Sequence, residues 1–241
     1  MLITITSLRL AGTAFLLLLF ASSRPAPLPE GTQAVNRLNA DEQAAGFRLM
    51  FNGRDLANWV HNGKPGSFTV KNGMITGDRM GHGELAYWLS TEREYGDFEL
   101  RLQYKIAKGG NSGVFIRAPR QGRASKLGME IQILDDGQKT GTPTAGSSSS
   151  IYQVVAPKAY ASKPAGEWND LWILCDGDRV KVTLNGQAVT DASMAEHESL
   201  QSRPRRGYIG LSAHTGPVQF RNIRLREIPG RQPITTTGAA P

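Results

Sequence analysis

Carboxylate, amide and guanidinium side chains gather in one stretch of this chain, residues 111–136. Two runs within it, 111–117 and 129–134, alternate apolar and polar residues with the period of two that a β-strand requires. In the second run Met129, Ile131 and Ile133 would share one face, and Glu130 and Gln132 the other, together with Leu134. A carboxylate and an amide on one strand face are typical of a sugar-binding or acid/base cleft. An ordinary solvated strand face explains the same pattern equally well.

Paired carboxylates would give this stretch acid/base chemistry, and the candidates are Glu99, Glu130, Asp135 and Asp136. Glu130 and Asp135 are five residues apart, so on a regular strand they would face opposite sides, about 16 Å apart. A bulge near Leu134 would bring Asp135 to the face of Glu130. The alternative is that the Asp-Asp-Gly sequence that ends the run only caps a turn.

Histidine is the other group that could transfer protons or hold a metal. The four histidines lack metal-ligand spacing, so the sequence indicates no histidine-built zinc site. His214 follows an apolar strand and precedes Thr-Gly-Pro, which places it at a cleft rim or in an ordinary structural role. The sequence also lacks the Gly-x-Ser-x-Gly elbow, a phosphate-binding loop and a dinucleotide fingerprint.

Strands must position these groups. Residues 97–107 alternate over a long run, as in an antiparallel sheet with one buried face. Asn-Gly pairs at 72–73 and 185–186 predict two tight hairpins. About ten short strands with hardly any helical periodicity favour an all-β sandwich or barrel. Residues 140–150, with four consecutive serines, predict a flexible loop at the rim of the cleft.

The chain ends differ from the region between them. Residues 1–23 have the basic, apolar, small-residue order of a secretory signal peptide, which predicts export to the periplasm or the extracellular space. Residues 24–45 are predicted to form a linker, with a single helical turn at 40–44. Residues 46–228 are predicted to form one domain, and residues 229–241 a disordered tail. No membrane span is expected after signal cleavage. Cys175, the only cysteine, lies in an apolar strand and reads as a core residue.

The chain is basic, with a formal net charge of +7, and arginines and lysines cluster at 117–126 and at 203–206. Such clusters are typical of proteins that bind nucleic acid or another anionic polymer. However, the basic residues are not interleaved with aromatic ones, and no nucleic-acid-binding module is visible. A solvated surface is therefore the preferred interpretation, and no nucleic-acid partner is expected.

A series of motifs, in the same order along the chain, resembles the 3-keto-disaccharide hydrolase domain family. The similarity covers residues 46–228, from the Phe-Arg-Leu-Met-Phe-Asn-Gly-Arg-Asp-Leu opening at 47–56 to Phe-Arg-Asn-Ile at 220–223. Between them come Asp-Phe-Glu-Leu at 97–100, the two central runs, Glu-Trp-Asn at 167–169, Leu-Asn-Gly at 184–186, and Gly-Tyr-Ile-Gly-Leu at 207–211 with His214. The resemblance implies a concanavalin A-like jelly-roll β-sandwich that acts on glycosides oxidised at carbon 3 of the sugar.

That chemistry requires a general base, a group that stabilises an enolate, and an acid for the leaving group. The resemblance implies Glu130 as base or metal ligand with Asp135 as its partner, Arg117 as the stabilising cation, and His214 as acid or ligand. The residues expected to bind the sugar are Asn111, Gln132, Trp168, Asn169 and Glu99. A divalent cation held by the carboxylates and His214 is compatible with this chemistry, but the sequence shows none.

Two other classes of function remain open. The same fold supports non-catalytic carbohydrate-binding modules, whose clefts have a similar polarity. A structural domain of an envelope assembly would use the basic loops against an anionic polymer. The enzymatic hypothesis depends on Glu130, Arg117 and His214 lying in one sugar-sized hollow.

Overall fold

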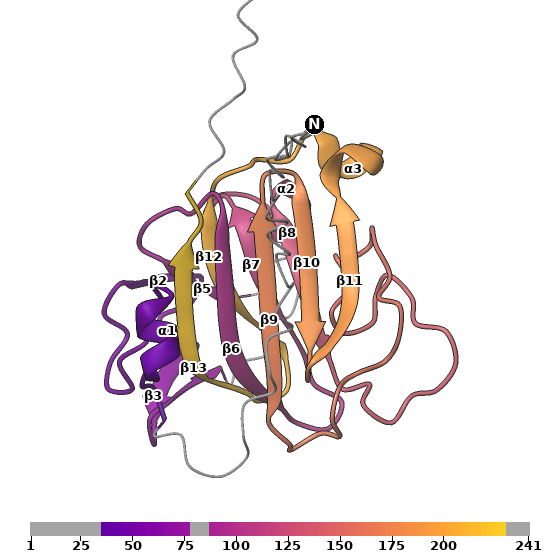
Figure 1. Ribbon diagram of the computed structural model, residues 1–241. Helices are drawn as coiled ribbons and strands as arrows, with labels where there is room; N and C mark the ends of the chain where they lie inside the picture. The colour runs from indigo at the N-terminus through magenta and orange to yellow at the C-terminus, as the bar shows by residue number, and fades with distance from the viewer. Residues whose placement is uncertain (1–34, 78–86, 230–241) are drawn as a thin grey trace, which may run out of the picture.

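The computed structural model describes residues 35–77 and 87–229, which form two antiparallel sheets packed face to face (Figure 1). The eight-stranded sheet has the order β11-β10-β9-β6-β13-β4-β3, and β1 pairs with β13. Its strands are β1 (Arg48–Leu49), β3 (Phe68–Lys71), β4 (Met74–Gly77), β6 (Phe98–Ile106), β9 (Asn169–Asp176), β10 (Arg179–Leu184), β11 (Gln187–Ser193) and β13 (Val218–Glu227).

The five-stranded sheet has the order β2-β5-β12-β7-β8. Its strands are β2 (Trp59–Asn62), β5 (Tyr87–Thr91), β7 (Asn111–Ala118), β8 (Met129–Leu134) and β12 (Tyr208–Thr215). The helical segments are short: α1 (Ala40–Ala44), α2 (Ala124–Leu127), the 3-10 turn η1 (Met194–Glu196) and α3 (Glu198–Gln201). The predicted all-β, concanavalin A-like jelly-roll sandwich is confirmed.

The apolar residues of the two sheets meet in one core because each inner strand alternates between a core face and an outer face. In β6 the predicted buried face, from Phe98 to Ile106, is at most 2% exposed. In β8 the residues Met129, Ile131 and Ile133 enter the same core, as their spacing predicts. Cys175 is fully buried there, and burial raises the pKa of its thiol to about 12.

Both predicted hairpins form, and their turns explain the Asn-Gly pairs. Asn72 and Asn185 adopt positive φ angles of 52° and 50°, and the following glycines have φ of 74° and 80°. Two successive positive φ angles define the tight turn whose twist matches paired strands. The turns connect β3 to β4 and β10 to β11.

Residues 35–45, which the sequence places in the linker, are attached to the eight-stranded sheet. The backbone N–H of Asn36 donates to Asn222 Oδ1 (2.6 Å), and the N–H of Asn222 donates to Asn36 Oδ1 (2.9 Å). Glu42 in α1, the expected helical turn, is buried and pairs with Arg224 of β13. This part of the predicted linker is therefore a folded piece of the domain.

The predicted flexible loop at 140–150 is also different in the structure. Its four serines, 147–150, are between 0 and 5% exposed. Ser149 N–H donates to Gln132 O (2.7 Å), and Thr190 Oγ1 of β11 donates to Ser149 O (2.7 Å). The segment thus covers the edge of β8 and bridges the two sheets, which protects an otherwise open strand edge.

Some predictions fall on residues outside the described ranges: the signal peptide at 1–23, the linker up to residue 34, and the tail beyond residue 229. In the described part of the chain no helix has the length and apolar composition needed to span a membrane.

Candidate functional site

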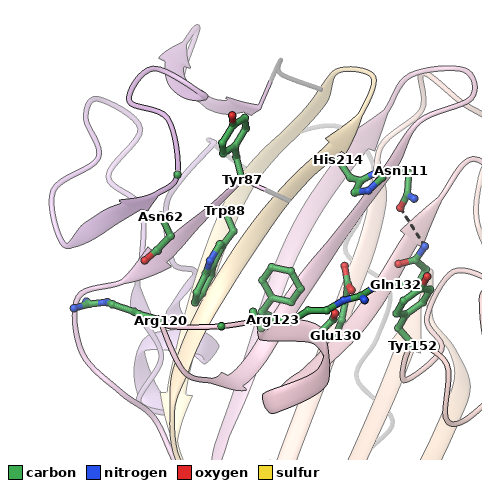
Figure 2. Close-up of a pocket in the computed structure, with 15 residues that line it drawn as sticks. Asn62, Tyr87, Trp88, Asn111, Arg120, Arg123, Glu130, Gln132, Tyr152 and His214 are labelled. Carbon is green, nitrogen blue, oxygen red and sulfur yellow. Dashed lines mark hydrogen bonds between the residues drawn. The ribbon is translucent and has the colours of Figure 1, made fainter. Parts of the chain in front are cut away.

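A hollow of about 510 Å³ opens on the outer face of the five-stranded sheet (Figure 2). Its lining comes from β2, β5, β7, β8 and β12, from the β7–β8 connection with α2, and from Tyr152. Because Met129, Ile131 and Ile133 face the core, Glu130 and Gln132 between them must face this hollow. The volume lies within the range of sites that bind small organic molecules.

Glu130 is the only carboxylate among the described residues that line the hollow, and its side chain is almost buried (9% exposed). No described residue donates a hydrogen bond to its carboxyl group. Burial raises the pKa of this carboxyl to about 8, and the positive charge of Arg123 partly opposes the rise. Both the acid and the base form are therefore populated near neutral pH, as a general acid/base requires.

Arg123 reaches the hollow from the β7–β8 connection, and its side chain extends toward Glu130 in Figure 2. Arg120 anchors this connection to the end of β5 through hydrogen bonds to Thr91 O (3.0 Å) and Glu92 O (2.8 Å). From the other side, Arg203 donates to Gly128 O (2.7 Å). The backbone that bears Arg123 is thus held at both ends.

Two amides and a histidine line the hollow beyond Glu130. Gln132 Nε2 donates to Asn111 Oδ1 (3.1 Å), shown as the dashed line in Figure 2. This bond leaves the amide N–H₂ of Asn111 and the carbonyl oxygen of Gln132 for a ligand. His214 lies beside Asn111, and its Nδ1 is 3.0 Å from Thr215 Oγ1.

A bulge in β12 places His214. Ala213 pairs with Ser112 and Thr215 with Asn111, so β12 has one residue more than β7 at this point. That extra residue is His214, and bulges commonly re-aim side chains beside functional sites. The sequence prediction that His214 lies at a cleft rim agrees with this position.

Aromatic rings form the other half of the hollow. Trp88 and Phe115 meet edge to face, with ring centroids 5.2 Å apart. Trp88 lies over Gly210, where a Cβ atom would stand 2.1 Å from the indole ring. Glycine at this position therefore makes room for the ring. Tyr87 and Asn62 complete this side.

Arg117 is not in the hollow, and the prediction that it converges there with Glu130 and His214 is wrong. Strand alternation would put it on the face of Phe115, but a bulge intervenes. Between the pairs Ala118–Tyr208 and Phe115–Gly210, β7 has two residues and β12 has one. Arg117 adopts a φ of 49°, and its side chain is fully buried.

The guanidinium of Arg117 makes its hydrogen bonds within the protein. It donates to Gly96 O (3.0 Å), Gly177 O (2.8 Å) and Asp97 Oδ1 (2.8 Å). These contacts tie one end of the sandwich together. Because the side chain is fully buried, a substrate cannot reach it.

Asp135 is also outside the hollow, and the turn-capping alternative describes the Asp-Asp pair correctly. Asp135 Oδ2 accepts from Gly109 N (2.8 Å), and its own N–H donates to Gly110 O (3.1 Å). Asp136 is buried and accepts from Ser148 N (2.8 Å) and Ser162 Oγ (2.8 Å). The predicted pairing of Asp135 with Glu130 on one face is therefore wrong.

The other three expected sugar-binding residues belong to the opposite sheet or its connection. Glu99 is buried in ion pairs with Arg101 and Arg226, both at 2.6 Å. Trp168 stacks against Arg221, whose Cζ is 3.9 Å from the ring centroid. Asn169 Oδ1 accepts from Lys163 N (2.8 Å) and Asn185 Nδ2 (2.8 Å). Their placement beside the hollow was predicted wrongly.

The hollow does not resemble a metal centre built from clustered ligands. Within residues 35–77 and 87–229, no group of three or more His, Cys, Asp or Glu side chains is arranged to hold a metal ion. Sequence reasoning missed eight contributors with polar or aromatic side chains: Asn62, Tyr87, Trp88, Phe115, Arg120, Arg123, Ser125 and Tyr152. The basic cluster at 117–126 was the available signal, but it was assigned to a solvated surface.

Comparisons with known proteins agree with the fold and with the family that the motifs predict for residues 46–228. The model of a 3-keto-alpha-glucoside-1,2-lyase-like domain matches residues 46–226. A 3-keto-disaccharide hydrolase of Bacteroides thetaiotaomicron is 27% identical over 237 residues, which cover 80% of this chain and 82% of that protein.

Two crystal structures of Parabacteroides distasonis proteins, provisionally named glycosyl hydrolases, have similar architectures. The first has a TM-score of 0.71 at 23% identity and covers 81% of this chain and 100% of its own. The second has a TM-score of 0.64 at 26% identity and covers 76% and 99%, respectively.

Proposed function

The chain belongs to the family of 3-keto-alpha-glucoside-1,2-lyase-like domains, and on this premise we propose that it cleaves glycosides whose sugar bears a ketone at carbon 3. The observation that supports this most directly is the buried carboxyl of Glu130, with a pKa raised to about 8, in a hollow of suitable size. The curated relative's activity on 3-keto-disaccharides points to the same substrate class.

The ketone determines the chemistry. It acidifies the hydrogen on carbon 2, so Glu130 in its ionised form removes that proton and leaves an enolate. The enolate then re-forms the ketone, makes a double bond between carbons 1 and 2, and expels the glycosidic oxygen from carbon 1. Water adds to carbon 1 while a proton returns to carbon 2, and the products are the 3-keto sugar and the free alcohol.

The neighbouring side chains fit the remaining roles. We assign protonation of the departing oxygen to His214, because it lines the same hollow as Glu130. The free amide groups of Asn111 and Gln132 would bind sugar hydroxyls. The aromatic half, with Trp88 and Phe115, offers an apolar surface to the sugar or to the group attached to it.

The test is to incubate the protein with the 3-keto-glucoside of 4-nitrophenol and follow nitrophenolate release. We expect turnover in the wild type, deuterium at carbon 2 of the sugar product in D₂O, and a loss of turnover in Glu130→Gln. Asp135→Asn is the matched control, because it also converts an acid to an amide but lies outside the hollow. It should keep near-normal turnover.

Three outcomes would overturn the proposal. Undiminished turnover in Glu130→Gln would show that Glu130 is not the general base. Cleavage of the unoxidised glucoside at a similar rate would indicate a conventional two-carboxylate glycosidase. Binding of sugar without any turnover by the wild type would indicate a carbohydrate-binding module.

We also propose that the chain is exported, on the signal-like order of residues 1–23. A mature N-terminus near residue 24, determined on protein secreted by a bacterial host, would support this. Full-length protein retained in the cytoplasm would contradict it.

A further inference from the structure

We propose that the guanidinium of Arg123 stabilises the enolate oxygen at carbon 3 of the substrate, and that Arg123 is therefore a catalytic residue. This inference rests on the proposed function and extends it. The enolate concentrates a negative charge on one oxygen, and an enzyme gains most from cations and N–H donors fixed where that charge develops.

Arg123 has the free donors that this role requires. It lines the hollow, yet its side chain makes no hydrogen bond or ion pair with any residue in the described part of the chain. The other cation of the lining, Arg120, is already used: it donates to backbone carbonyls and stacks on Tyr208, with its Cζ 4.0 Å from the ring centroid. Five N–H donors of Arg123 thus remain for a ligand.

The position of Arg123 also suits the reacting atoms. Its charge acts on the carboxyl of Glu130, and in Figure 2 the two side chains converge on one part of the hollow. A sugar whose carbon 2 meets Glu130 has carbon 3 one bond away. We therefore assign the guanidinium to the oxygen on carbon 3, next to the carbon whose proton Glu130 removes.

The backbone around Arg123 is fixed before substrate binds. Its carbonyl accepts from the N–H groups of Lys126 and Leu127 in α2, both at 2.9 Å. Arg120 and Arg203 hold the two ends of this connection, as described above. A cation on such a support needs little rearrangement at the moment of reaction, and this is the condition under which electrostatic stabilisation is most effective.

The test separates enolate formation from cleavage. Free 3-keto-glucose in D₂O exchanges its hydrogen on carbon 2 only through the enolate, and NMR follows this exchange with no leaving group involved. We expect Arg123→Gln to slow both this exchange and kcat for nitrophenolate release by about 100- to 1,000-fold. KM should change only a few-fold, since the charge develops after binding.

The pH profile adds a readout that a purely structural role would not move. Arg123 lowers the pKa of Glu130, so its loss in Arg123→Gln should shift the acidic limb of kcat/KM to higher pH. Arg123→Lys keeps the charge and should keep the limb in place, with a smaller loss of kcat. Lys126→Gln, which removes an exposed cation of α2 outside the hollow, is the control and should behave as wild type.

Exchange and cleavage at wild-type rates in Arg123→Gln would overturn this inference while leaving the proposed function intact. An acidic limb of kcat/KM that does not shift in Arg123→Gln would also contradict the inference. If the wild type itself shows neither exchange nor cleavage, the proposed function fails first, so the two failures are distinguishable. Thermal unfolding of each variant establishes that the comparison is between folded proteins.

Discussion

The carboxyl group of Glu130 rests over the backbone of Gly113, diagonally opposite on the neighbouring strand. A Cβ atom at Gly113 would stand 2.2 Å from Oε1 of Glu130 and 2.8 Å from its Cγ. The absence of a side chain at Gly113 therefore sets where the carboxyl rests on the floor of the hollow. This explains physically why the central motif Asn-Ser-Gly has glycine at its third position.

We predict that Gly113→Ala lowers kcat/KM on the 3-keto-glucoside by about 10- to 100-fold, because the added methyl group displaces the base from its working position. Steady-state kinetics check this. Gly146→Ala is the control, since the nearest atom to a Cβ there is 3.7 Å away. Equal activity of the two variants would show that the position of Glu130 is not set by Gly113.

A second prediction concerns the pH dependence of the reaction. Glu130 must be ionised to remove a proton, and its pKa is raised to about 8. We expect kcat/KM to rise with pH through an inflection near pH 8, far above the range of an ordinary glutamate. A rate profile that is already flat above pH 6 would contradict this. Asp135→Asn should retain the wild-type profile.

Outside the bulges, strand periodicity predicted correctly which face of a strand a residue occupies, and this was enough to place Glu130 and Gln132 on an outer face. It could not predict which of two stacked sheets a strand joins, so Glu99 was assigned to the wrong side of the molecule. Pairing partners are set by contacts distant in sequence, which a local pattern does not encode.

Local breaks in the pattern account for the remaining errors. One bulge turned Arg117 away from the hollow, and another brought His214 toward it. The serine segment at 147–150 reads as flexible from composition, but the open edge of β8 gives its backbone hydrogen-bond partners. Composition carries no information about a neighbouring strand edge, so the sequence could not predict that the serine segment is ordered.

Arg117 gives a third prediction, in which stability and activity separate. Arg117→Met removes the guanidinium from Asp97, which keeps only the backbone N–H of Gly177, and leaves two backbone carbonyls without their donor. We expect the free energy of unfolding to fall by about 3 to 5 kcal/mol, measured by denaturant unfolding. The folded fraction should retain near-normal kcat, because Arg117 does not line the hollow.

The less disruptive Arg117→Lys keeps a charge opposite Asp97 and serves if the methionine variant does not fold. Arg179→Met, which removes an exposed partner of Asp191, is the control for the loss of an ion pair and should change stability little. A large loss of kcat in folded Arg117→Lys would show that Arg117 takes part in the reaction.

A fourth prediction tests whether residues 35–45 belong to the folded domain. Glu42 neutralises Arg224, a largely buried guanidinium whose pKa is lowered by burial. Glu42→Gln should lower the free energy of unfolding by about 3 kcal/mol, because it leaves that charge unpaired. Asp41→Asn, an exposed acid in the same helix, is the matched control. Equal stability of both variants would mean that α1 is dispensable.

The last prediction is that Glu130 reduces the stability of the fold at alkaline pH. In the unfolded chain its carboxyl has an ordinary pKa, near 4.5, whereas in the folded protein the pKa is about 8. Between these values the folded state holds a proton that the unfolded state has lost. The free energy of unfolding must therefore fall as pH rises through this window, by up to about 1.4 kcal/mol per pH unit.

Glu130→Gln removes this titration, since glutamine has no proton to lose. The variant should match the wild type near pH 4, below the unfolded pKa, and become more stable than the wild type at pH 8 to 9, as measured by urea unfolding at several pH values. Its gain in stability should accompany its loss of turnover, because the burial that makes the carboxyl an effective base is the same burial that opposes its ionisation. Parallel stability curves for the two proteins would show that Glu130 titrates normally.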